Sequence, residues 1–414
     1  MEPTGEVSRV EDVSAATELA LGTPILSERL SEVVKPNHSV VIAATDLTRP
    51  CPDRVIIPPI LNELNASGVP DDKISIVIGL GLHRSMDDRE INHKFGEEIA
   101  RRIEILNHDP ATSEKLVDLG ESSRGAPMVV NKSVVEADFL ISTGIVEPHV
   151  YAGYSGGRKT VAIGCAAEGT IGYLHSAKIL DDPGTRLGAI ESNVFHETAT
   201  ELALKAGLDF IVNMVLLGER VAVGVFAGKP IEAYERAVEL ADRTFKVQVP
   251  EPADIVIAGV GYPKSANLYQ ASRGASNLLS VAKPIVKDGG VVITPAPCEE
   301  GVGLGMGERR FYEAFSSAKS LDDVIYDAKT RGLPPGGHRA YVLAKALKRA
   351  DLIVVASKIP DKVEKMHMRA ARDMDEAMRM AYGKCGRDAT VLVVPKSLLT
   401  LPICSSPARA STSS

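Results

Sequence analysis

Short apolar runs rich in β-branched residues alternate along the chain with stretches of helical periodicity. The runs predict strands at 39–44, 74–79, 137–142, 255–259, 290–294, 352–356 and 390–394. Helical patterns lie at 59–67, 230–244, 277–282 and 339–350, and we expect Pro59 and Pro230 each to open a helix, where a missing N–H costs nothing. Continuous apolar strands that alternate with helices are typical of parallel sheets covered on both faces. The pattern therefore predicts an α/β protein.

A proline-rich break divides this pattern in two. Val-Pro-Glu-Pro at 249–252 separates a long predicted helix from a fresh strand, and 414 residues are too many for one ordinary core. We expect two α/β lobes with mainly parallel sheets and an active-site cleft between them, built from domains at 1–248 and 249–400. Residues 401–414, which end in the Ser-rich segment 405–414, are expected to form a disordered tail.

The composition is that of a soluble globular enzyme, with 44% hydrophobic and 24% charged residues. A net charge of −7 and the lack of a long basic cluster argue against nucleic acid as a partner. No apolar stretch reaches the roughly 18 residues of a membrane span, and the acidic N-terminus does not resemble a signal peptide. The five cysteines form no CxxC pair and are expected to be reduced. We expect a cytoplasmic protein that binds neither nucleic acid nor membrane.

Polar residues follow three of the predicted strands, at the carboxyl ends where open parallel sheets bind ligands. They stand at 45–50 (TDLTRP), 79–84 (GLGLHR) and 147–149 (EPH). Asp46 could accept a hydrogen bond from a ribose hydroxyl, and Arg49 could clamp a carboxylate or phosphate through two hydrogen bonds. An Asp-Thr turn with a surface arginine explains the same residues equally well.

Several candidate functional residues lie close together in the segment 149–159 (HVYAGYSGGRK). Gly153, Ser155, Gly156 and Gly157 stand directly before two cations, Arg158 and Lys159, so backbone N–H groups and positive charge could meet a phosphate. The segment lacks the glycine spacing and the Ser/Thr of a Walker A motif. A glycine-rich turn with a solvated basic end is the structural alternative.

Four histidines follow strands or glycine loops, where a ring nitrogen could act as a base, an acid or a metal ligand: His83, His108, His149 and His175. The other histidines lie in helical or turn segments and are interpreted as ordinary. In the second lobe, Gln270 and Arg273 are three residues apart after Tyr269, so one helix face could hold a carboxylate. A solvated helix end is the alternative for this group.

Taken together, these motifs resemble the nickel-pincer lactate racemase (LarA) family, over about 26–395. The hallmark is His-x-x-Ala-Gly-x-Ser-Gly-Gly-Arg-Lys, present without a gap at 149–159. Supporting matches are the Asp-x-Thr-Arg-Pro turn at 46–50, the Gly-Leu-His-Arg loop at 81–84, Asn-His-Asp at 107–109, His175 and the Tyr-Gln pair at 269–270.

The resemblance implies an isomerase that racemises or epimerises C2 of a small 2-hydroxyacid by reversible hydride transfer to a nickel-pincer nucleotide. This cofactor is a pyridinium-3,5-bisthiocarboxylic acid mononucleotide that grips nickel, and enzymes that build it are expected in the host. The resemblance implies that Lys159 is the point of covalent attachment, that His175 is the nickel ligand, and that His83 and His149 are the acid/base pair. The other residues that would bind the cofactor are Asp46, Ser155, Gly156, Gly157 and Arg158. Those that would bind the substrate are Arg49, Tyr269, Gln270 and Arg273. The N-terminal domain would then bind the cofactor and carry out catalysis, and the C-terminal domain would contribute substrate-binding residues.

Two features depart from the family pattern. Arg273 stands where members with lactate activity carry lysine, and a planar guanidinium changes reach and geometry at a carboxylate site. We therefore expect a larger or dicarboxylic hydroxyacid, or a sugar acid, as the substrate on equal terms with lactate. The N-terminus also differs from the usual start. Two other functions remain open from the residues alone: a binding protein for a nickel nucleotide or phosphate ligand without turnover, and a 2-hydroxyacid dehydrogenase, against which the absence of GxGxxG after the first strand counts.

Overall fold

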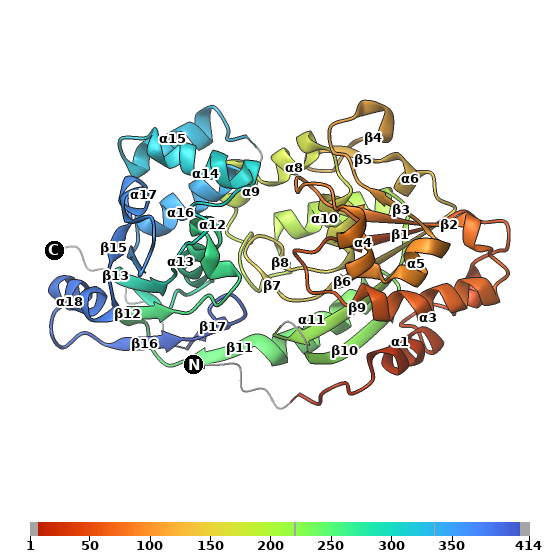
Figure 1. The fold of residues 1–414 in the computed structure, drawn as a ribbon, viewed down its shortest axis with the longest axis horizontal. Helices are drawn as coiled ribbons and strands as arrows, with labels where there is room; N and C mark the ends of the chain where they lie inside the picture. The colour runs from red at the N-terminus through yellow and green to blue at the C-terminus, as the bar shows by residue number, and fades with distance from the viewer. Residues whose placement is uncertain (1–6, 219–220, 335, 406–414) are drawn as a thin grey trace. The chain divides into compact units, whose positions relative to one another are not determined.

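The protein, as a computed structural model, is described for residues 7–218, 221–334 and 336–405 (Figure 1). It divides into two compact units. Among the described residues, the N-terminal unit comprises 7–175 together with Ala189–Thr244, and the C-terminal unit comprises Ser176–Gly188 and the chain from Phe245 onward. The expected domain bounds, 1–248 and 249–400, stay a prediction.

A six-stranded sheet forms the centre of the N-terminal unit, in the order β10-β9-β6-β1-β2-β3. Its strands are β1 (Val40–Thr45), β2 (Ile74–Gly79), β3 (Glu104–Asn107), β6 (Phe139–Ile145), β9 (Leu208–Leu217) and β10 (Val221–Gly228). Every pairing is parallel except that of β9 with β10. Ile42, Ile76 and Ile141 are fully buried in the core, which confirms the expected parallel sheet with apolar strands.

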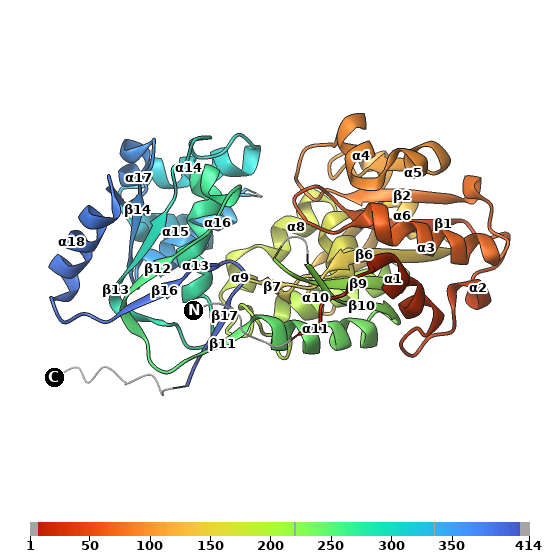
Figure 2. The same cartoon turned by 60° about the horizontal axis from the view of Figure 1, so that its bottom comes forward.

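Helices cover both faces of this sheet. One face packs against α1 (Val13–Gly22), α2 (Leu30–Val33), α3 (Asp53–Ala66), α4 (Asp88–Phe95) and α5 (Glu97–Arg102). The other α-helices of the unit are α6 (Lys132–Val135), α7 (Gly157–Lys159), α8 (Glu168–Leu174), α10 (Val194–Lys205) and α11 (Glu232–Phe245), and a π-helical turn lies at Thr160–Gly164. Figure 2 shows α10 and α11 together at the β9–β10 end of the sheet. Two hairpins are added by β4 (Leu116–Glu121) with β5 (Pro127–Asn131) and by β7 (Pro148–His149) with β8 (Gly153–Tyr154).

The expected role of Pro59 is wrong. Helix α3 begins at Asp53, and Pro58 and Pro59 lie inside it. The helix tolerates them because its apolar face, which includes Ile56, Ile57 and Ile60, is fully buried against the sheet, so tertiary packing outweighs the lost backbone hydrogen bonds. Helix α11 begins two residues after Pro230, near the expected position.

The direction of the strand order reverses between β1 and β6. From β1 the chain adds β2 and β3 on one side, and from β6 it adds β9 and β10 on the other. Such a reversal leaves a crevice at the carboxyl ends of the two central strands, which is the usual ligand site of open α/β sheets. The segments that follow these strands begin at Asp46 and at Val146.

The C-terminal unit contains a second sheet of five parallel strands, in the order β15-β14-β13-β12-β16. These are β12 (Ala253–Ala258), β13 (Val286–Pro295), β14 (Asp351–Val355), β15 (Arg369–Ala371) and β16 (Val391–Val394). Its helices are α9 (Ala177–Leu180), α12 (Leu268–Ala271), α13 (Arg273–Leu279), α14 (Met306–Ser316), α15 (Leu321–Thr330), α16 (His338–Leu347), α17 (Pro360–Lys365) and α18 (Met374–Cys385). Helices α13 and α16 pack on one face and α18 on the other (Figure 1).

The expected tail begins too early. Residues Leu401–Cys404 form β17, which pairs in parallel with β11 (Lys246–Val249), and Leu401 and Cys404 are buried. Apolar side chains that reach a core explain the added strand. The rest of the expected tail, 406–414, lies outside the described residues. Among the described residues, the helices include none that is long and apolar enough to cross a membrane.

Candidate functional site

The turn after β1 fixes Asp46 at the strand reversal of the N-terminal unit. The Thr48 backbone N–H and hydroxyl donate to Asp46 Oδ1 at 3.2 and 2.7 Å, and the Arg49 N–H donates to the Asp46 carbonyl at 3.2 Å. This Asp-Thr turn is the local structure that the sequence allowed as an alternative. It leaves the second carboxylate oxygen, Oδ2, to face another element.

That element is the loop after β2, which brings His83 to Asp46. The Nδ1 atom of His83 lies 2.6 Å from Asp46 Oδ2, and the two side chains are 57% and 8% exposed. Burial alone would raise the pKa of Asp46, but the hydrogen bond and charge of His83, with help from Thr48 and Arg49, lower it below its ordinary value. An ionised Asp46 holds a proton on Nδ1 of His83, so the ring can accept a proton at Nε2.

An ion pair joins the two segments that follow β1 and β6. Arg49 Nη1 lies 2.9 Å from Glu147 Oε1, 98 positions away in sequence. Ser155 closes the Glu147 loop, because its hydroxyl donates to the Ile145 carbonyl at 2.7 Å and accepts from the Glu147 N–H at 3.1 Å. Ser155 therefore shapes the loop that presents Glu147 and His149.

Four rings gather beyond this loop: His149, Tyr151, His175 and Phe195. Tyr151 meets both histidines edge to face at centroid distances of 5.6 and 5.5 Å, and Phe195 lies 6.4 Å from His149 and 5.1 Å from His175. Each contact favours one ring orientation. The backbone N–H groups of Tyr151 and Ala152 both donate to His149 Nδ1 at 3.2 Å, so a neutral His149 carries its proton on Nε2.

His175 directly follows α8 and has the opposite arrangement. Its Nδ1–H donates to the Ile171 carbonyl at 2.8 Å, which leaves the lone pair on Nε2. Burial lowers the pKa of His175 to about 4, the Ile171 bond opposes this shift, and the positive charge of Lys159 adds to it. The ring is therefore neutral at physiological pH and oriented by a backbone carbonyl, as metal-binding histidines usually are.

The glycines of 149–159 pack against the unit itself. A Cβ atom on Gly153 would lie 1.9 Å from the Ala189 carbonyl oxygen, and one on Gly156 would lie 2.8 Å from the Tyr234 ring. The Gly157 N–H donates to Asn213 Oδ1 at 2.9 Å. The glycine spacing therefore reflects close contact between this segment and its neighbours, beside any role toward a ligand.

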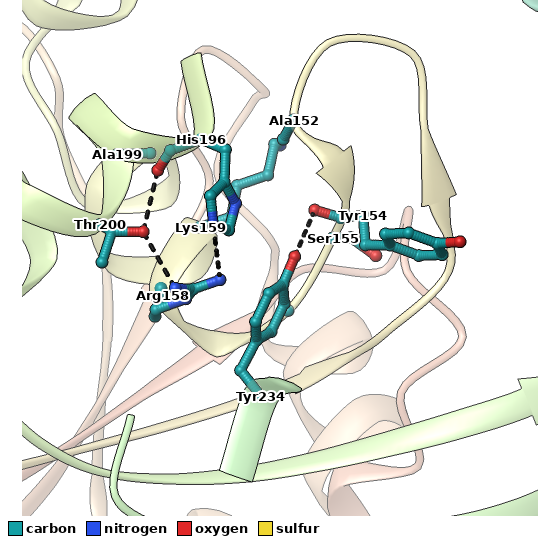
Figure 3. Close-up of a pocket in the computed structure, with 10 residues that line it drawn as sticks. Ala152, Tyr154, Ser155, Arg158, Lys159, His196, Ala199, Thr200 and Tyr234 are labelled. Carbon is teal, nitrogen blue, oxygen red and sulfur yellow. Dashed lines mark hydrogen bonds between the residues drawn. The ribbon is translucent and has the colours of Figure 1, made fainter. Parts of the chain in front are cut away.

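Arg158 and Lys159 line a small pocket, shown in Figure 3, and the Arg158 side chain is buried beside it. Arg158 is 5% exposed, its guanidinium lies 3.6 Å above the Tyr234 ring, and it donates to Thr200 Oγ1 at 3.0 Å and to His196 Nε2 at 3.3 Å. Burial, and then the charge of Arg158, lower the pKa of His196 to about 3. Arg158 is thus an internal cation within a neutral polar cluster.

The substrate-binding candidates of the C-terminal unit lie after β12. The Asn267 side chain caps α12 by accepting from the Gln270 N–H at 2.9 Å, and Arg273, the first residue of α13, donates to Gln270 Oε1 at 3.0 Å. The Tyr269 carbonyl accepts from buried Arg339 at 3.3 Å. The three-residue spacing therefore does place the Gln270 amide and the Arg273 guanidinium side by side.

The sequence misjudged some residues of this region. His108 is a structural histidine, since Nε2–H donates to the Ala166 carbonyl at 2.9 Å and Nδ1 accepts from Asn131 at 3.2 Å. Glu147 was noted only as part of a strand end, Tyr151 only as part of the motif, and His196 was interpreted as ordinary. Phe195 was not singled out, because an apolar ring on a helix carries no chemical signal of its own.

The side chains that could bind a metal indicate whether a nickel nucleotide fits this unit. Among the described residues, no group of three or more His, Cys, Asp and Glu side chains is arranged to hold a metal ion. One neutral imidazole, His175, with its lone pair on Nε2 and the charge of Lys159 acting on it, suits a metal whose other donors come from an organic ligand. The residues present therefore fit such a cofactor.

Known proteins similar to the chain cover nearly all of it. Family models for the lactate racemase N-terminal and C-terminal domains match residues 2–188 and 248–400. The lactate racemase of Lactiplantibacillus plantarum is 33% identical over 382 residues, 92% of this chain and 89% of that protein. The lactate racemase of Thermoanaerobacterium thermosaccharolyticum is 34% identical over 381 residues, 91% of this chain and 87% of that protein.

Solved structures give the same result. The lactate racemase apoprotein from T. thermosaccharolyticum matches with a TM-score of 0.87 and 30% identity, covering 97% of this chain and 95% of that one. A protein from Thermotoga maritima shares the fold, with a TM-score of 0.71, 19% identity and coverage of 96% and 100%. The chain therefore belongs to the lactate racemase family and is an isomerase of the racemase type.

Proposed function

We propose that this racemase inverts C2 of a 2-hydroxyacid with the help of a nickel-pincer pyridinium nucleotide bound in the N-terminal unit. The observation that carries the proposal is the neutral His175, held by Ile171 with its lone pair on Nε2 and subject to the charge of Lys159, in the same unit as the His83–Asp46 pair. Lys159 would tether the cofactor, and His175 would be the protein ligand of nickel. When bound, the cofactor supplies a hydride acceptor for C2 of the substrate.

His83 and His149 are the proposed acid/base pair. His83 takes the hydroxyl proton at Nε2, and the resulting imidazolium is stabilised by Asp46 through Nδ1. His149 presents an N–H at Nε2, because two backbone N–H groups occupy Nδ1. Adding a second proton at Nδ1 would oppose these two donors, so protonation of His149 is coupled to a change in the 149–152 turn.

The cofactor-binding roles divide between side chains and packing. Asp46 retains its proposed contact with a ribose, beside the two hydrogen-bonded partners it has in the unit. Ser155 and Gly156 line the same pocket as Lys159, and the Gly157 N–H donates to Asn213. Arg158 contributes positive charge from within the protein, because its guanidinium is engaged by Tyr234, Thr200 and His196.

The substrate carboxylate is proposed to bind Arg49, Gln270 and Arg273, with Tyr269 supporting the last two. Both curated relatives are named for lactate, which makes lactate the reference substrate. The Arg273–Gln270 pair offers a wider planar donor set than a lysine, so larger or dicarboxylic hydroxyacids are equally suited. The host is expected to supply enzymes that build the cofactor.

The test is racemisation of a panel of single-enantiomer hydroxyacids, followed by chiral chromatography, with protein produced alongside the cofactor-forming enzymes. We expect one or more members to reach a racemic or epimeric mixture without added NAD. Unchanged enantiomers across the panel, with nickel and cofactor verified by intact mass and metal analysis, would contradict the proposal.

The His83→Ala variant distinguishes catalysis from binding alone. General acid/base catalysis is worth about 10²–10⁴-fold, so turnover should fall by that range while the cofactor stays bound. His93→Ala, on the exposed part of α4, is the matched control and should leave turnover unchanged. Equal activity of the His83 variant and the control would exclude the proposed role of His83.

A further inference from the structure

A buried ion pair lies beneath the turn that carries Asp46 and Arg49. Lys94 Nζ, near the end of α4, is 2.8 Å from Asp53 Oδ2, and the two side chains are 4% and 0% exposed. The other carboxylate oxygen of Asp53 accepts from Thr143 Oγ1 at 2.9 Å. Thr143 lies on β6, so the pair links α4, the start of α3 and one of the two central strands of the sheet.

Lys94 also binds the backbone of the turn directly. Its ammonium donates to the carbonyls of Arg49 and Cys51, both at 3.1 Å, and to Thr45 Oγ1 at 3.4 Å. These acceptors stand on both sides of the turn, at the last residue of β1 and just before α3. A single buried cation therefore holds the turn at three points while Asp53 neutralises it.

A pair of this kind is a poor source of stability, because removing two charges from water costs about as much as their attraction returns. Burial alone would lower the pKa of Lys94, but Asp53, Cys51 and Asp46 together raise it above its ordinary value, so the group stays charged. Apolar side chains could fill the same space without the desolvation cost. What they could not do is donate to the carbonyls of Arg49 and Cys51.

We propose that Lys94 is a positioning residue, which holds the 45–51 turn so that Asp46 meets His83 and Arg49 meets Glu147. Lys94 acts through the turn and touches neither substrate nor cofactor. The inference rests on the proposed function only in treating this turn as part of the active site; the positioning itself is a property of the protein without ligand.

The test removes both charges together, so that no buried charge is left unpaired. Lys94→Met/Asp53→Asn keeps the net charge, and the introduced amide oxygen can still accept from Thr143. The matched control is Lys384→Met/Asp351→Asn in the C-terminal unit, which removes a Lys–Asp pair of the same 2.8 Å length at 38% and 34% exposure. Thermal unfolding checks that each variant folds.

Three readouts follow on folded protein. In the Lys94 variant we expect amide hydrogen exchange at 46–51 to accelerate at least tenfold, with β1 and β2 unchanged. The carboxyl of Asp46, followed by ¹³C NMR, should titrate at higher pH because its contact with His83 is less populated. With cofactor loaded, kcat/KM should fall at least tenfold, and the control pair should change none of the three.

The outcomes separate this inference from the proposed function. Failure of the wild-type protein to racemise any hydroxyacid would remove the kinetic readout, but exchange and the Asp46 titration would still decide the role of Lys94. The inference is overturned if the double variant folds and keeps the wild-type exchange and Asp46 titration. It is also overturned if the double variant does not fold, since the pair would then serve the fold as a whole.

Discussion

In His175, a hydrogen bond to the backbone determines which ring nitrogen carries the proton and which carries the lone pair. Its Nδ1–H is committed to Ile171, and burial holds the pKa near 4, so the neutral ring carries its lone pair on Nε2. His108 is also buried, but there Nε2 is the donor and Nδ1 the acceptor. The two residues look alike in sequence and differ in which ring nitrogen the fold commits to a backbone carbonyl.

Replacement of His175 should therefore release the metal. In His175→Ala, nickel retained per chain after cofactor loading and desalting should fall at least about tenfold, because losing even a partner of a metal ligand costs about 10–100-fold in metal affinity. Elemental analysis measures it. His93→Ala is the control and should keep the wild-type nickel content. Full nickel retention by the His175 variant would show that His175 is not needed to hold the metal.

His196 should make the protein sensitive to acid. Its folded pKa is about 3, below the ordinary 6.5, so below pH 6.5 the unfolded chain binds a proton that the folded chain does not. Stability is therefore unaffected above pH 6.5 and falls as the pH decreases toward 3. This residue alone should cost roughly 2 kcal/mol between pH 7 and pH 5.

Denaturant unfolding of the wild-type protein and of His196→Gln at pH 7 and pH 5 measures this difference. The glutamine can still accept a hydrogen bond from Arg158 but does not titrate, so the variant isolates the contribution of the histidine. The wild-type protein should lose about 2 kcal/mol more than the variant between pH 7 and pH 5. The same pH dependence of stability in both proteins would contradict the lowered pKa of His196 in the folded state.

At the scale of elements, the segment from β8 through α7 is built by close packing. Gly156 has φ +143° and lies against the ring of Tyr234 on α11, and the same ring supports the Arg158 guanidinium. The Tyr234 ring thus packs against both Gly156 and the Arg158 guanidinium. The position of Lys159, next along α7, follows from these contacts.

Gly156→Ala should consequently be costly. A Cβ atom would meet Tyr234 at 2.8 Å on a backbone that L residues rarely adopt, so we expect the free energy of unfolding to fall by at least about 2 kcal/mol. Gly169→Ala on α8, where no atom lies within 4 Å, is the control and should be neutral or stabilising by up to about 1 kcal/mol. Equal stability of both variants would contradict the packing argument.

At the scale of the whole molecule, the chain passes between the two units more than once. It leaves the N-terminal unit after His175, returns at Ala189 and leaves again after Thr244. The proposed metal ligand therefore stands at the first of these passages. Each unit has its own sheet and core, and in each some candidate residues follow a strand beside a reversal of strand order: Asp46 after β1 and Gln270 after β12.

The proposed determinant of substrate choice, Arg273, lies in the C-terminal unit. In Arg273→Lys we expect kcat/KM for lactate to rise about tenfold relative to a larger or dicarboxylic hydroxyacid, a change of about 1.4 kcal/mol. Competition assays with both substrates measure the ratio. An unchanged ratio would mean that specificity is set elsewhere.

Seven of the strands and the family could be predicted from the sequence alone, whereas β9 and β10 of the N-terminal sheet were missed. Apolar β-branched runs are local signals, so β2 was predicted at its observed bounds and the other predicted strands within a few residues. The motif at 149–159 is also local, and it carried the identification of a racemase. Where local propensity and packing disagree, as at Pro59 in α3 and at 401–404 in β17, packing decided.

The pairing of residues far apart in the sequence is set by the tertiary structure. His83 meets Asp46 across 37 positions and Arg49 meets Glu147 across 98, and no periodicity records such partners. The burial of Arg158 could not be inferred either, since a glycine-rich stretch ending in Arg-Lys reads as a solvated turn. Protonation states and the support that Lys94 gives the 45–51 turn follow from these long-range contacts, because burial and hydrogen-bond partners are set when the strands assemble.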